Sequence, residues 1–178
     1  DTKFSHDRGI YSEPFNLEIT SKTENSIIYY TEDGTIPDPV SSLIYKNPIL
    51  INSTKIIRAI AYKKNLLQTN VDTHSYIFPT AVIKQKGTNP ELPRTWGGEP
   101  ADYEMDPEIV NDPDYSEFII PALEALPSLS IAINPDDFYG PSGIYQHPKS
   151  DGERWERSIS VELITTDGIE KGFQINSG

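Results

Sequence analysis

The chain contains the run Tyr30-Thr31-Glu32-Asp33-Gly34-Thr35-Ile36-Pro37, which directly follows the apolar stretch Ile27-Ile28-Tyr29. β-Branched and aromatic residues favour a strand that leads into the run. Asp33 and Gly34 then favour a tight turn, because aspartate bonds the nearby backbone and glycine tolerates positive φ angles. Pro37 fixes the backbone at the exit of that turn. The run therefore predicts a β-strand closed by a turn within an all-β fold.

Strand patterns lie on both sides of this run. Phe15, Leu17 and Ile19 alternate with polar residues, which is the two-residue period of a half-buried strand. The same residue types predict further strands at Ile49–Ile51, Lys55–Tyr62 and Thr73–Phe78, and turns at Glu24–Ser26 and Lys63–Asn65. No helical period separates these strands. The predicted fold class is therefore mainly β, with residues 1–79 forming an immunoglobulin- or fibronectin-like β-sandwich.

The run resembles the Y-T-x-D-G-[ST]-x-P signature of the fibronectin-III-like domain at the C-terminus of chitobiases and β-hexosaminidases. Further stretches resemble that family in the correct order: Gly9–Tyr11 with Glu13–Phe15, Ser42–Tyr45 with Asn47–Ile49, Arg58–Ala61, and Thr73–Tyr76. The resemblance implies a non-catalytic accessory domain of the kind found in large exported bacterial proteins. It also implies that Tyr30, Asp33, Gly34 and Pro37 form a structural motif rather than a catalytic one.

The amino-acid composition and net charge disfavour several classes of function. Fifteen prolines and eleven glycines against one methionine favour many turns and few long helices. The net charge of −12 disfavours nucleic acid and anionic membranes, because binding phosphate needs clustered Lys and Arg. Zero cysteine excludes disulfides, thiol catalysis and cysteine-ligated zinc. No apolar stretch reaches the ~20 residues of a membrane span, so we do not expect direct membrane insertion. Since the chain begins at Asp1 without a signal-peptide pattern, we expect a processed or excised segment.

Residues 80–115 change character. Proline, glycine and acidic residues interrupt every pattern, so this segment is predicted to be an extended arm without regular elements. Trp96, Tyr103 and Met105 are large apolar groups within it, and we expect them to anchor the arm to a neighbouring surface.

Residues 116–178 are predicted to be a partial α+β segment. A helix is indicated at residues 114–126, with Pro121 bending or dividing it and Asp112 or Asp114 capping it. Strands are indicated at residues 128–133, 159–164 and 172–175. Thr165-Thr166-Asp167-Gly168 predicts a hairpin turn between the last two.

This second half resembles the start of the CotH family, the spore-coat-type protein kinase-like domain. The resemblance is carried by Leu126–Ser130, Gly143–Tyr145, Trp155–Glu162 and Phe173–Gly178. It implies that residues 116–178 are the incomplete N-terminal portion of such a domain, with the catalytic residues of the parent downstream of this chain.

Two sets of residues are candidate binding groups. Asp102, Glu104 and Asp106 are spaced two apart, as in some calcium loops, although the EF-hand order is missing; the alternative is a solvated acidic arm. Trp96 and Trp155 offer aromatic faces for stacking on sugar rings; the alternative is that both tryptophans pack inside the protein.

We find no self-sufficient active site. G-x-S-x-G is absent, the histidines lack metal spacing, and His74 is expected to face solvent from its strand. Asp136-Asp137-Phe138-Tyr139-Gly140 differs from the kinase D-F-G motif, and Asn134-Pro135-Asp136-Asp137 instead predicts a turn with a helix N-cap.

Three functions follow for this chain, none of them with a catalytic residue assigned. The first is a non-catalytic scaffold or adhesion segment of an exported or cell-surface protein, with other domains of its own polypeptide or cell-surface proteins as partners. The second is the leading part of a CotH-like kinase. The third is a carbohydrate-binding module with a polysaccharide partner.

Overall fold

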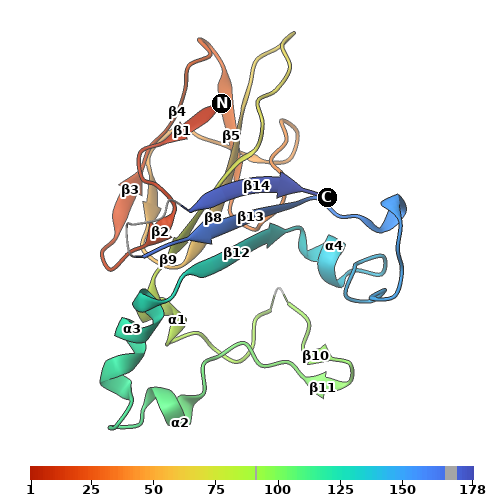
Figure 1. Ribbon diagram of the computed structural model, residues 1–178. Coiled ribbons are helices and arrows are strands. Elements are labelled where there is room, and N and C mark those ends of the chain that lie inside the picture. Colours follow the sequence, from red (N-terminus) through yellow and green to blue (C-terminus); the bar gives the residue numbers. More distant parts are fainter. Residues whose placement is uncertain (91, 167–171) are drawn as a thin grey trace.

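The computed structural model describes residues 1–90, 92–166 and 172–178 (Figure 1). The fold is mainly β, as predicted, and its sheets form three layers. The strands of the first half are β1 (Thr2–Phe4), β2 (Gly9–Ile10), β3 (Phe15–Leu17), β4 (Ile19–Ser21), β5 (Ile27–Thr31), β6 (Leu43–Ile44), β7 (Ile49–Ile51), β8 (Lys55–Tyr62) and β9 (Asp72–Ile77). Strands β2-β9-β8-β5-β6 form one sheet, and the pairs β1-β4 and β3-β7 form the layer that faces it.

The single strand predicted from Phe15 to Ile19 is two strands. Glu18 separates β3 from β4, and its backbone oxygen accepts a hydrogen bond from the Ser5 amide at 2.9 Å. The chain thereby changes its pairing partner from β7 to β1. Strand β1 was not predicted, since three residues carry too little periodicity to be recognised.

A single apolar core lies between the two sandwich layers. Leu17 and Ile51 from one layer meet Ile57 and Tyr76 from the other, and all four are fully buried. Because side chains alternate along a strand, Ile57 marks the core-facing side of β8 and Tyr76 marks that of β9. The opposite face of the five-stranded sheet is buried as well. Its residues include Tyr29 on β5, Arg58 and Ile60 on β8, and Thr73 and Ser75 on β9.

The third layer covers that opposite face. It is an antiparallel sheet of β12 (Ser128–Ile133), β13 (Ile159–Ile164) and β14 (Phe173–Ser177), which lies across β8 and β9 in Figure 1. The first two strands have the predicted bounds, and the third begins at Phe173 rather than at Gly172. The central residues of the predicted hairpin turn, Asp167 and Gly168, fall outside the described residues.

The arm contains short regular elements, so the expectation of none is wrong. They are α1 (Pro79–Val82), the hairpin β10 (Thr95–Trp96) and β11 (Glu99–Pro100), and α2 (Pro107–Val110). Proline stands at the first position of both helices, where its missing donor costs nothing. Gly97 and Gly98 turn the hairpin with φ angles of 56° and 95°. Residues that break longer elements therefore start and close these short ones.

Helix α3 (Ser116–Ala125) leads directly into β12, and the short helix α4 (Pro135–Tyr139) follows that strand. A 3₁₀ turn, η1 (Glu153–Trp155), comes before β13. Pro121 lies inside α3 without dividing it. The predicted cap is wrong: Tyr115 is the N-cap residue, while Asp112 instead accepts a hydrogen bond from the Asp114 amide at 2.7 Å.

Truncation of Leu17 tests where the core lies. Leu17→Ala is expected to lower the free energy of unfolding by about 2–5 kcal/mol, because a fully buried side chain leaves a cavity. Leu67→Ala is the matched control, since Leu67 is 97% exposed and its loss is expected to change stability by less than about 0.5 kcal/mol. Urea unfolding of both variants measures the difference, and equal effects would contradict the assigned core.

Candidate functional site

The most unusual polar site of the chain is buried between the sandwich and the third layer. It is centred on Glu162, in the middle of β13, whose side chain is fully buried. Its Oε1 atom lies 3.0 Å from Nε of Arg8, and Oε2 accepts a hydrogen bond from the hydroxyl of Ser75 on β9. The same hydroxyl lies 2.7 Å from Oγ of Ser130 on β12. The site thus joins residues from both halves of the chain.

A second contact lies at the other end of β12. Arg58 points from β8 toward the third layer and is 2% exposed, and its Nη1 donates to the Gly34 carbonyl at 2.8 Å. A Cβ atom on Gly34 would stand 3.0 Å from the carbonyl oxygen of Ile133, the last residue of β12. Gly34 also has a φ of 82°, so this position needs glycine for its conformation and for the close approach. The turn of the Tyr30–Pro37 run therefore contacts the third layer.

Burial dominates the electrostatics of Glu162. Removal from water raises the pKa of this carboxyl above its ordinary value, whereas the hydrogen bonds from Ser75 and the charges of Arg8 and Arg58 oppose that rise. Burial likewise lowers the pKa of Arg58, an effect that Glu162 opposes. Glu162 and Arg58 lie in different halves of the chain, and the charge of each favours the ionised form of the other.

His74 lies beside this site, and the expectation that it faces solvent is wrong. Its ring stacks on Phe4 with centroids 4.2 Å apart. Burial, together with the nearby Arg8 charge, lowers the pKa of His74 to about 4, although Asp7 and a hydrogen bond with the His6 backbone act in the opposite direction. His74 is therefore neutral in the folded protein near pH 7.

The four residues of the sequence signature shape the turn after β5. Oδ1 of Asp33 accepts hydrogen bonds from the amide and hydroxyl of Thr35, at 3.0 and 2.5 Å. Pro37 is fully buried at the exit, and Tyr30 packs against the sandwich core. With Gly34 at the interface, these residues hold the turn in the shape that the third layer contacts.

The three acids of the calcium hypothesis each bond a nearby backbone amide. Asp102 accepts from the Glu104 amide at 3.0 Å, Glu104 from the Gly87 amide at 3.0 Å, and Asp106 from the Glu108 amide at 2.8 Å. Within residues 1–90, 92–166 and 172–178, no three His, Asp or Glu side chains are grouped so as to hold a metal ion. Calcium binding by these acids stays a prediction.

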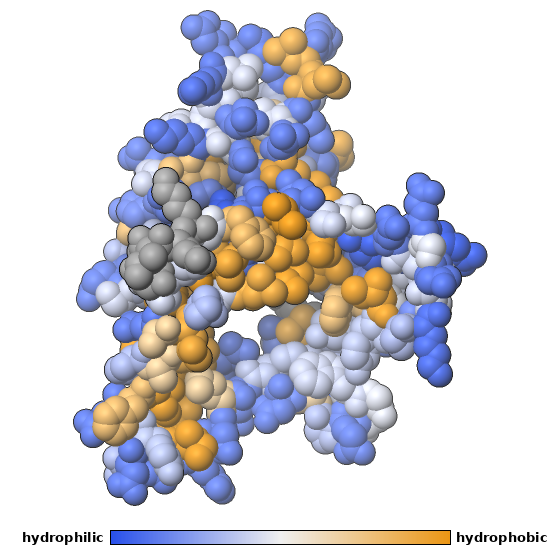
Figure 2. Space-filling view, viewed as in Figure 1, coloured by the Kyte–Doolittle hydropathy of each residue, from blue (hydrophilic) through white to orange (hydrophobic). Residues whose placement is uncertain are grey.

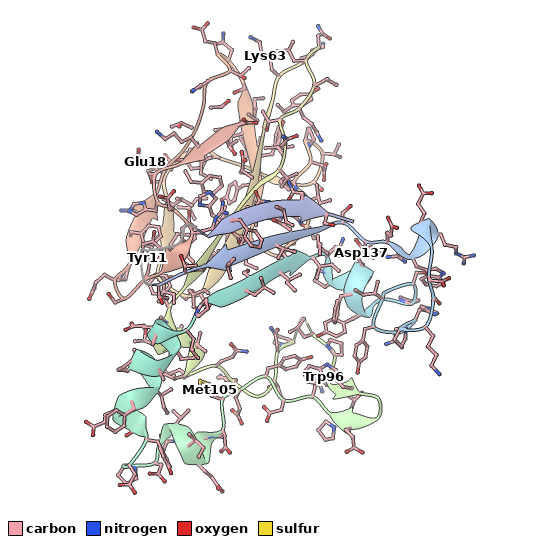
Figure 3. The ribbon with its side chains drawn as sticks, in the orientation of Figure 1. Tyr11, Glu18, Lys63, Trp96, Met105 and Asp137 are labelled. Carbon is pink, nitrogen blue, oxygen red and sulfur yellow. The ribbon has the colours of Figure 1, made fainter. Side chains whose placement is uncertain are left out.

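The two tryptophans lie in separate clusters. Trp96 lies on the hairpin of the arm (Figure 3). Its ring packs edge-on against that of Tyr103, with centroids 5.2 Å apart. Burial, together with the nearby Tyr103 hydroxyl, raises the pKa of Tyr139 on α4, so α4 lies beside this cluster of the arm. The cluster accounts for the anchoring that we expected of Trp96 and Tyr103.

Trp155 has different neighbours. His147 lies against its ring at 4.5 Å between centroids, and the guanidinium groups of Arg154 and Arg157 lie 5.1 and 5.7 Å from the ring centroid. Protein groups therefore occupy the surroundings of this ring, and sugar stacking by the two tryptophans stays a prediction.

The residues that join the two halves were missed in the sequence, although a signal for them exists. Arg58 stands among Ile56, Ile57, Ala59 and Ile60, and Glu162 stands within an equally apolar strand. A charge in the middle of a β-branched run marks either an exposed face or a buried pair, and the sequence does not give its partner.

The predicted N-cap of α4 is confirmed: the Asn134 side chain accepts a hydrogen bond from the Asp136 amide at the start of this helix.

One known family matches part of the first half of the chain. Residues 6–73 match the model of the chitobiase/β-hexosaminidase C-terminal domain family, a non-catalytic, carbohydrate-associated accessory domain typical of exported proteins. The match begins after β1 and ends within β9, so the sandwich extends beyond it at both ends. No curated protein matches the chain. The match gives no support to the CotH resemblance of the second half.

No helix among the described residues is long and apolar enough to cross a membrane.

Glu162→Gln tests whether burial or the nearby arginines dominate the pKa of the buried carboxyl. A raised folded-state pKa means that the native protein binds the proton more tightly than the unfolded chain. The stability of the wild type relative to Glu162→Gln is therefore expected to fall as the pH rises from about 4.5 through the raised pKa. Urea unfolding of both proteins from pH 4 to 8 measures this difference; an increase with pH would mean that the arginines, not burial, dominate.

His74→Phe tests the neutral histidine. Because the folded-state pKa is lowered from 6.5 to about 4, the unfolded chain takes up a proton first as the pH falls. Stability contributed by His74 is thus expected to decline between pH 6.5 and 4, by on the order of 3 kcal/mol. Phenylalanine keeps a ring against Phe4 and removes this dependence. A parallel decline in wild type and variant would show that His74 titrates normally.

Proposed function

We propose that this chain is a non-catalytic scaffold segment of a large exported protein, which holds neighbouring domains of the same polypeptide in a fixed arrangement. The contact of Arg8 and Ser75 with Glu162 is the observation that carries the proposal. It joins positions at opposite ends of the sequence through a fully buried carboxylate. Breaking one partner of a buried pair typically costs about 3–5 kcal/mol, so the two halves resist separation.

The accessory domain in the first half supports this role, because its family is non-catalytic and typical of exported proteins. The polar atoms of Glu162 and Ser75 bond one another rather than facing a cleft. Such a site stabilises a contact between layers and offers no group to a substrate.

A CotH-like kinase parent is the finer alternative, and it rests only on the resemblance of residues 126–130, 143–145, 155–162 and 173–178. Under that proposal the scaffold would precede the catalytic part of the parent and fix its position relative to the sandwich. Carbohydrate binding has weaker support, because the two tryptophans lie in separate clusters and the ring of Trp155 already contacts His147 and Arg154.

Spin labels test whether the two halves move as one body. The absence of cysteine allows labels at Glu24→Cys, in the sandwich, and Ser177→Cys, on β14, both exposed positions. Electron–electron double resonance is expected to give one narrow distance distribution, because the buried site locks the layers. Adding Glu162→Ala is expected to broaden it severalfold, whereas the exposed control Glu156→Ala leaves it unchanged.

A broad distribution in the otherwise unchanged protein would contradict the scaffold role. Circular dichroism of the Glu162→Ala protein distinguishes separation of intact layers from unfolding. If that variant unfolds, Ser75→Ala provides the milder change, since it removes the hydroxyl and leaves the ion pair with Arg8 in place.

A further inference from the structure

The inner face of the third layer is largely polar, and its outer face is apolar. Ser130, Ser160, Glu162, Gln174 and Asn176 share the face that meets the sandwich with the buried Ala132 and Ile164. The opposite face carries eight apolar side chains and, at the end of β14, Ser177. The apolar side chains are Leu129, Ile131, Ile133, Ile159, Val161, Leu163, Phe173 and Ile175, which we call the open face.

The open face is aligned and exposed. The register places Leu129, Leu163 and Phe173 in one row across the sheet, and Ile131, Val161 and Ile175 in the next. The edge strands are the most exposed, with Leu129 at 60% and Ile175 at 51%. Figure 2 shows apolar side chains gathered over β12, β13 and β14. A contiguous apolar patch of this kind on a soluble domain marks an interaction site.

The dimensions fit one helix. The six residues of β12 span about 20 Å, and the outer strands of a three-stranded sheet lie about 10 Å apart. An α-helix is about 10 Å across and covers 20 Å in about 13 residues. Layer packing of a helix on a sheet is also the ordinary way to bury such a face.

A second copy of the chain fits less well. Eight side chains are far fewer than the roughly 20–30 residues a side of a stable protein–protein interface. Each copy also carries a net charge of −12, which opposes self-association. A small contact is sufficient when both partners belong to one polypeptide, because the effective concentration reaches the millimolar range.

We propose that the open face binds an amphipathic helix with basic flanks, supplied by a neighbouring domain of the same polypeptide. This deepens the proposed scaffold function by naming the surface and the partner. The apolar stripe of the helix covers the rows of Leu129 and Ile131. Its flanking lysines or arginines meet an acidic protein, which contains 27 acidic against 15 basic side chains.

Titration with a designed peptide tests the proposal. The probe is an 18-residue helix with a leucine stripe and lysine flanks, added to isotope-labelled protein and followed by NMR. We expect saturable shifts confined to β12, β13 and β14. The double variant Ile131→Ser, Ile175→Ser is expected to bind at least tenfold more weakly. The matched control Val40→Ser, Leu67→Ser removes two apolar side chains that are at least 95% exposed elsewhere and is expected to bind normally.

The charge of the partner is tested separately. The same peptide with glutamate in place of lysine is expected to bind at least tenfold more weakly at low salt, and equal binding would overturn the basic flanks. Absence of saturable shifts, or equal loss in the control variant, would overturn the open face as a helix site. Dimerisation in sedimentation experiments that Ile131→Ser abolishes would assign the face to a second copy instead. Failure of the scaffold function appears in the spin-label distances, which do not depend on the peptide.

Discussion

The structure depends on a carboxylate that has been removed from water in the middle of a β-strand. Glu162 is compensated by Arg8 and by two donors of Ser75, and all three residues come from different strands or loops. An ion pair buried in this way contributes little net stability over an apolar alternative, but it is costly to break from one side. Its effect is therefore to fix one arrangement of the third layer on the sandwich.

The sandwich is shaped to receive this layer. In a two-layer sandwich, the outer face of a strand such as β8 would be solvated and polar. Here Arg58 and Ile60 on that outer face are as buried as Ile57 and Ala59 on the core face. The Tyr30–Pro37 turn contributes as well, since Gly34 approaches β12 where a side chain would collide. The turn that marks the accessory domain in the sequence is thus also part of the interface.

Much of the fold could be predicted because its signals are local. The strands at residues 55–62, 128–133 and 159–164 have the bounds that alternation and β-branched residues indicate. The third layer's position on the sandwich could not be predicted, since periodicity shows that a strand has two unlike faces and not what each face meets. His74 illustrates the limit: its strand was correct, but only the stacking on Phe4 shows that the half-buried ring packs against the protein. For the same reason, Arg58 and Glu162 were visible as charges but not as neighbours.

The separation of Ser75 and Glu162 along the sequence has a consequence for biosynthesis. Their hydrogen bond joins positions 87 residues apart. At ribosomal rates of roughly 5–20 residues per second, the sandwich emerges several seconds before β13 exists. During that interval Arg58 and Ile60 stay without the layer that later buries them. The nascent chain therefore passes through a stage with an open sheet surface, which a chaperone has time to bind before the third layer covers it.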